Sequence, residues 1–125
     1  MKRVGFLLVL FVGVSGLTYG QNINKLSKKF YKAFDKNNLE EVVVQGNKIL
    51  QIFRKNNREL SPSDMEYRLY IGYSLNQLGR INECMTFELE TIDLLKDKTD
   101  SIFRKQYVES LSSIAIVYSN KKLYK

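Results

Sequence analysis

The chain has 125 residues, with 20 Lys and Arg against 13 Asp and Glu, and it contains no His, one Cys and one Pro. This length predicts one small domain. The absence of His removes the usual general base at neutral pH and the commonest metal ligand, and a single Cys excludes an internal disulfide. We therefore expect a protein that is not an enzyme, with no catalytic residues, no cofactor and no metal site.

Residues 1–20 are predicted to be a signal peptide. A basic start is followed by an apolar stretch over residues 4–14 and then by small residues. The apolar stretch is shorter than the roughly 20 residues that a membrane-spanning helix needs. We expect cleavage after Gly20, with Gly16 as the alternative position, and the competing interpretation is an uncleaved anchor. The segment predicts export to the periplasm or the cell exterior, with no membrane span left after cleavage.

Two helices are predicted in the first part of the mature chain. One covers residues 24–36, and the next begins at Leu39 and continues through Phe53. Both carry apolar residues at the three-to-four spacing of a helix face. The polar residues 35–38 separate them, where Asn tolerates the left-handed backbone conformation of a turn.

A second pair of helices follows a polar connector over residues 54–61. Ser61 is the predicted N-cap and Pro62 the first helical residue. Gly79 is predicted to end this helix in the left-handed conformation, and Gly72 to let a neighbouring helix approach closely. The fourth helix begins at Ile81, and its predicted apolar positions are Ile81, Cys84, Met85, Leu89, Ile92 and Leu95.

The fifth helix is predicted to follow a cap at Thr99 or Asp100. Its predicted apolar face consists of Phe103, Tyr107, Leu111, Ile114 and Tyr118. Because Ile114, Ile116 and Val117 point to several sides, we expect this helix to need a covering partner. Either it caps the domain or the chain is the N-terminal piece of a longer array.

Three acidic or thiol groups are interpreted as structural rather than chemical. Glu88 and Glu90 are two residues apart on a helix and do not share a face, so we expect both on the helix surface. Cys84 is expected to be a small packing residue between helices.

A turn followed by an apolar helix recurs along the chain. Residues 38–42 match residues 80–84 at an offset of 42, and a third copy appears at residues 122–125. A period of 20 to 50 residues is typical of stacked helical units. In this pattern the chain resembles the tetratricopeptide repeat family, and the longer kinesin-light-chain-like repeats in particular. The matching residues are Ile71, Gly72, Leu75, Leu78, Gly79, Ile81 and Cys84, with Ile114, Ala115, Tyr118 and Tyr124 in the last unit.

The resemblance implies an all-α fold, in which antiparallel helix pairs stack as a short right-handed solenoid of about five helices. The implied domain covers residues 21–125, with units at roughly 22–60, 61–100 and 101–125, the last one incomplete. Phe30 occupies the position that Gly72 and Ala115 hold in the other units, so we expect the first pair to be irregular. An ordinary helix hairpin at residues 65–95 is the alternative.

In this family the first helix of each unit lines a groove that holds a peptide or a helix of a partner. The corresponding positions here are Tyr31, Asp35, Glu66, Leu69, Tyr73, Asn76, Gln77, Ser112, Ser119 and Asn120. The resemblance implies an exported module that binds a protein or peptide partner, as the N-terminal part of a larger sensor or scaffold, with self-association or docking through its terminal helix.

The basic charge motivates an alternative function. Without Lys2 and Arg3, 18 of the 20 basic residues remain against 13 acidic ones, a net charge of +5. A basic helical domain can bind nucleic acid or an anionic surface. Because the basic residues are spread along the sequence with acids nearby, we expect no nucleic-acid partner.

Overall fold

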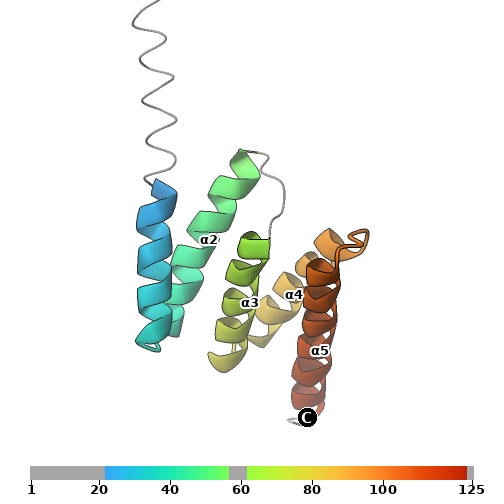
Figure 1. Ribbon diagram of the computed structural model, residues 1–125. Helices are drawn as coiled ribbons and strands as arrows, with labels where there is room; N and C mark the ends of the chain where they lie inside the picture. The colour runs from blue at the N-terminus through green and yellow to red at the C-terminus, as the bar shows by residue number, and fades with distance from the viewer. Residues whose placement is uncertain (1–21, 57–61, 124–125) are drawn as a thin grey trace, which may run out of the picture.

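A computed structural model describes residues 22–56 and 62–123 of the chain (Figure 1). This part of the chain is entirely helical and contains no strand, which confirms the predicted all-α class. The first helix covers residues 22–35 and is called helix 22–35 below. The other four are α2 (Leu39–Lys55), α3 (Pro62–Gln77), α4 (Ile81–Leu95) and α5 (Ser101–Leu123).

The five helices lie in two rows. In Figure 1, helix 22–35, α3 and α5 stand side by side at the front, while α2 and α4 lie behind them. The central helix is α3, which packs against α2, α4 and α5, and α5 also packs against α4. Helix 22–35 joins α3 through its aromatic side chains. The predicted burial of α3 on more than one side is therefore confirmed.

The turns form where the sequence predicts them. Gly79 has a φ of 73° and Asn37 a φ of 57°, so both adopt the left-handed conformation that ends a helix. At the start of α5, the backbone N–H of Ile102 donates to Oδ1 of Asp100 at 2.9 Å, which makes Asp100 the predicted cap. Pro62 is the first residue of α3, and the predicted N-cap at Ser61 lies outside the described residues.

Replacing Gly79 by alanine should lower the free energy of unfolding by about 1–2 kcal/mol, because a side chain disfavours the left-handed conformation. Nothing lies within 4 Å of a Cβ added there, so the backbone alone causes the loss. Thermal unfolding followed by circular dichroism measures it. Gly79→Asn is the control and should lose less, because Asn tolerates this conformation. Equal stability of Gly79→Ala and the natural chain would contradict the prediction.

The core is centred on Phe30, which is completely buried. Its bulk is accommodated by Gly46 on α2, where an added Cβ would lie 3.0 Å from the Phe30 ring and 2.6 Å from Ile71. In the first helix pair, the large residue Phe30 lies on the first helix and the glycine on the second. In the next pair the glycine, Gly72, lies on the first helix and the large residue, Glu88, on the second. The other buried apolar residues of this core are Ala33, Val42, Val43, Ile49, Phe53, Tyr67, Leu75, Cys84 and Val117.

The buried side of α4 agrees with the predicted one at Cys84 and Leu95 but not at Leu89. Leu89 is 54% exposed, whereas Glu88 is only 4% exposed. The buried row is Cys84, Glu88, Thr91 and Leu95. The prediction that Glu88 lies on the helix surface is therefore wrong, because α5 packs against this side of α4 and because Gly72 leaves room for the carboxylate.

The helix α5 follows its predicted apolar face only in part, because Phe103, Tyr107 and Ile114 are half-buried. Gln106, Ser110 and Val117 are buried, while Leu111 and Tyr118 are exposed. Ser110 is buried here because the neighbouring Glu88 of α4 is polar, and a buried polar group needs a polar neighbour. The exposed apolar residues of α5 are Ile102, Val108, Leu111, Ile116 and Tyr118.

Candidate functional site

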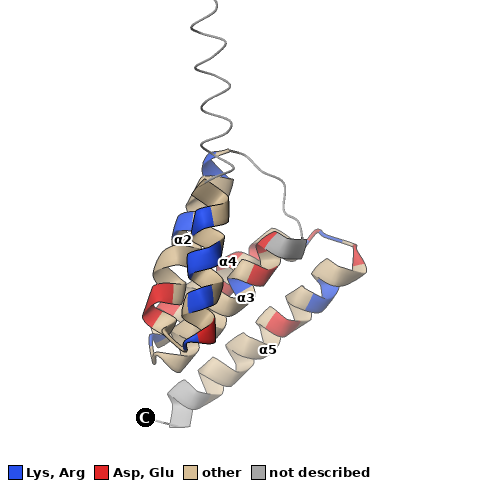
Figure 2. Ribbon diagram, turned by 60° about the vertical axis from the view of Figure 1, so that its left-hand side comes forward, with Lys and Arg blue, Asp and Glu red and all other residues tan. Residues whose placement is uncertain are grey.

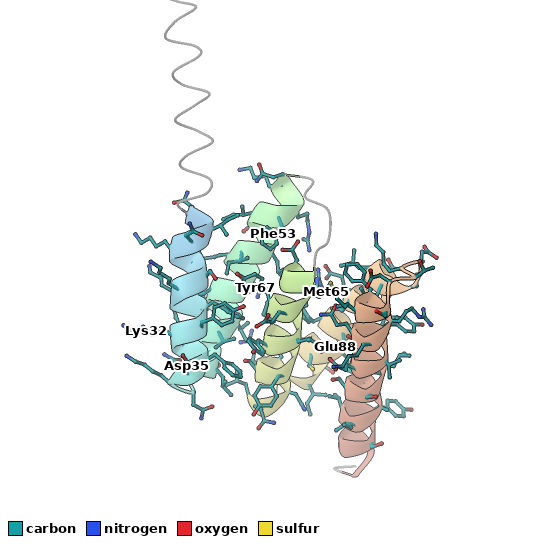
Figure 3. The ribbon with its side chains drawn as sticks, in the orientation of Figure 1. Lys32, Asp35, Phe53, Met65, Tyr67 and Glu88 are labelled. Atoms are coloured by element: carbon teal, nitrogen blue, oxygen red, sulfur yellow. The ribbon has the colours of Figure 1, made fainter. Side chains whose placement is uncertain are left out.

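Aromatic and acidic side chains gather where helix 22–35 meets α3. The Phe34 and Tyr70 rings stack with centroids 4.4 Å apart, and the Tyr73 ring lies 6.1 Å from Phe34. The hydroxyl of Tyr31 donates to Oε1 of Glu66 at 3.2 Å. We call these residues, Tyr31, Phe34, Glu66, Tyr70 and Tyr73, the tyrosine face. Tyr67 lies next to it, between the two helices in Figure 3, and its hydroxyl is hydrogen-bonded to Ser27 at 2.8 Å.

The hydroxyls of Tyr31 and Tyr70 remain protonated at neutral pH. Burial, followed by the negative charge of Glu66, raises the pKa of Tyr31 above its ordinary value of 10.0. The same two causes raise the pKa of Tyr70. Both side chains therefore keep an O–H donor for Glu66 over the whole neutral range.

The structure brings some of the predicted groove residues together and leaves others apart. Tyr31, Glu66 and Tyr73 belong to the tyrosine face, and Tyr73 is 50% exposed at its edge. The other predicted residues on helix 22–35 and α3 are half-buried (Leu69 and Asn76) or exposed (Asp35 and Gln77). Ser112 and Ser119 are exposed on α5, and the side chain of Asn120 lies outside the described part.

Phe34 and Tyr70 were not among the predicted site residues. Tyr70 could have been found from the sequence, because Glu66, Tyr70 and Tyr73 follow one another at spacings of four and three on one helix face. Phe34 could not, since its role depends on how helix 22–35 packs against α3.

Glu88 forms a second chemical feature, a buried carboxyl group between α3, α4 and α5. Figure 3 shows it beside α3 and α5, and a Cβ on Gly72 would collide with its Oε1. Burial raises the pKa of Glu88 from its ordinary 4.5 to about 7, although the hydroxyl of Ser110 and the charge of Arg68 act in the opposite direction. With this pKa, the Glu88 carboxyl group holds its proton below about pH 7.

Cys84, one turn before Glu88, is a packing residue as predicted. It is 1% exposed, and its thiol donates to the backbone carbonyl of Gly72 at 3.5 Å. Burial, with a smaller contribution from Glu88, raises the pKa of the Cys84 thiol to about 11. The reactive thiolate form is therefore scarce at neutral pH.

Lysines line the outer side of helix 22–35. Lys25, Lys28, Lys29 and Lys32 on this helix, and Lys36 directly after its end, are all exposed and follow one another at helical spacing. In Figure 2, bands of basic residues run along the helix that follows the grey N-terminal trace. We call these five residues the lysine stripe. The basic residues are therefore not all dispersed, as expected above, and the three-to-four spacing of this stripe is visible in the sequence.

Within residues 22–56 and 62–123, no three His, Cys, Asp or Glu side chains come together as ligands for a metal ion. None of the helices in this part is long and apolar enough to cross a membrane.

Comparison with protein families, with curated proteins and with solved structures finds no significant match to this chain.

Proposed function

We propose that the chain is a non-catalytic helical-repeat module of an exported protein that binds a peptide or protein segment on its tyrosine face. The observation that carries the proposal is Tyr73, a large aromatic side chain that is 50% exposed beside the stacked rings of Phe34 and Tyr70. Tyrosines are enriched among the residues that supply most of the binding energy in protein interfaces.

The hydrogen bonds of the tyrosine face support the same function. Glu66 is held by Tyr31, so this carboxylate has a fixed position before any partner arrives. A surface whose side chains are already ordered loses less conformational entropy on binding. The two-row arrangement of five helices agrees with the resemblance to tetratricopeptide repeats, and we place the tyrosine face in the proposed groove. In this proposal the module forms the N-terminal part of a larger sensor or scaffold.

The test is the selection of peptides that bind the full chain from a random displayed library, followed by fluorescence anisotropy with the selected peptides. Tyr73→Ala should weaken binding by about tenfold or more, because such residues contribute on the order of 2 kcal/mol when truncated. Tyr118→Ala is the matched control, because Tyr118 is equally exposed, at 52%, but lies on α5. Peptides whose affinity is changed equally by both substitutions would contradict the proposal.

The lysine stripe favours a second candidate function, binding to an anionic surface or nucleic acid. Four exposed lysines on one side of a helix, and a fifth directly after its end, concentrate positive charge over a few turns. Such binding weakens steeply as salt rises. In the same assay, a ligand that is released by salt and is insensitive to Tyr73→Ala would support this second function over the first.

A further inference from the structure

A groove runs between α2 and α4, on the opposite side of α3 from the tyrosine face. Three adjoining hollows of about 180, 350 and 380 Å³ form it, and all three contain Glu90 in their walls. From α3, Asp64, Arg68 and Leu75 line these hollows. None of the ten predicted groove residues lines them.

The floor of the groove contains a buried arginine whose hydrogen bonds are incomplete. Arg68 is 5% exposed, and its two Nη atoms donate to Thr91 and to Glu90, each at 3.1 Å. Its guanidinium group also lies 5.1 Å from the centroid of the Phe87 ring. The third nitrogen of the guanidinium group, Nε, is buried and has no hydrogen-bond partner among the described residues. Because buried donors are rarely left unpaired, this atom indicates a place for an acceptor.

A second arginine shares the same carboxylate oxygen. Nη2 of Arg54 lies 2.9 Å from Oε1 of Glu90, and Nη2 of Arg68 lies 3.1 Å from that same atom. The side chains of Arg54 and Glu90 are 71% and 45% exposed, so water screens their attraction. Arg68 is buried and needs a carboxylate beside it, so Glu90 is expected to leave only when another carboxylate takes its place. Apart from Glu90, the smallest hollow contains two guanidinium groups and the carboxylate of Asp64, an excess of positive charge.

The walls of the groove limit what can bind there. Leu50, Phe53 and Leu94 provide an apolar wall beside the two arginines. A hollow of 180 Å³ is smaller than the roughly 300–1,000 Å³ of sites for drug-sized ligands. It suits one side chain, while the adjoining hollows continue along Asn47 and Gln51, whose exposed amides can bond a peptide backbone.

We propose that the groove between α2 and α4 binds an extended segment of a partner protein, and that an Asp or Glu of this segment replaces Glu90 between Arg54 and Arg68. The apolar neighbours of that residue lie against Leu50 and Leu94. In the free protein, Glu90 occupies the position between the two arginines that the carboxylate of the partner takes in the complex.

The experiment titrates two capped pentapeptides into the ¹⁵N-labelled full chain and follows the backbone and arginine Nε signals by NMR. The peptides are Leu-Ala-Asp-Ala-Leu and the same sequence with Asn in place of Asp. We expect the Asp peptide to shift the signals of α2 and α4 and of Arg68 Nε. It should bind about fivefold more tightly than the Asn peptide, because charge-assisted hydrogen bonds are roughly twice as strong as neutral ones.

Two substitutions test the roles of the charges without touching the buried Arg68. Arg54→Gln should weaken binding of the Asp peptide about fivefold, whereas Lys55→Gln removes the same charge from the next residue and should change it less than twofold. Glu90→Gln should strengthen binding, because it removes the competing carboxylate. The proposal would be overturned by equal affinity for the two peptides, or by equal effects of Arg54→Gln and Lys55→Gln. It would also be overturned if free isovalerate, a small carboxylate with an apolar chain and no peptide backbone, bound as tightly as the Asp peptide.

Discussion

Replacing Phe30 by alanine is expected to lower the free energy of unfolding by about 3–5 kcal/mol, the largest stability effect that we predict for this chain. Phe30 is 0% exposed, and its ring lies 5.1 Å from Tyr67 and 6.0 Å from Tyr70, centroid to centroid. Alanine would remove these contacts and leave a cavity opposite Gly46, which has no side chain to fill it.

Urea unfolding followed by far-UV circular dichroism measures this loss. Because small proteins are stable by only about 5–15 kcal/mol, the variant should unfold at a much lower urea concentration. Phe34→Ala on the same helix is the control, and its half-buried ring should cost less. If the two substitutions lower stability equally, Phe30 is not the centre of the core.

Glu88→Gln is expected to make the protein more stable at pH 8 by on the order of 2–3 kcal/mol and to change its stability little at pH 4.5. Burial raises the pKa of Glu88 in the folded chain to about 7, against an ordinary value of 4.5 that we take for the unfolded chain. Between these two values the folded state binds more protons than the unfolded state, so stability falls as pH rises. Glutamine stays neutral and removes this dependence while preserving the shape of the side chain.

Unfolding free energies of the natural chain and of Glu88→Gln from pH 4.5 to pH 8 provide the test. The difference between the two should be absent below about pH 4.5, grow through pH 7 and then level off. Glu40→Gln is the control, because it removes the same charge from a side chain that is 66% exposed. Parallel pH profiles of the natural chain and Glu88→Gln would show that Glu88 is not buried between the helices.

The candidate site was only partly predictable from the sequence. Tyr31, Glu66 and Tyr73 were named from the family resemblance, and the structure places them in one cluster. The tight contact at Gly72 was also predicted, but its neighbour is the Glu88 carboxylate rather than a helix backbone. The α2–α4 groove could not be predicted, because Arg54, Arg68 and Glu90 meet from three helices that are separated along the chain.

The sequence by itself determined where each described helix lies and where it turns. Apolar spacing located the helices, and Asn37, Gly79 and Asp100 marked their ends, because these preferences depend on residues a few positions apart. Only the tertiary structure decided which sides of α4 and α5 are buried. The local pattern favoured Leu89, but the buried residue is Glu88. Packing against α3 and α5 gives this carboxyl group its space beside Gly72, its neighbours Ser110 and Arg68, and its raised pKa.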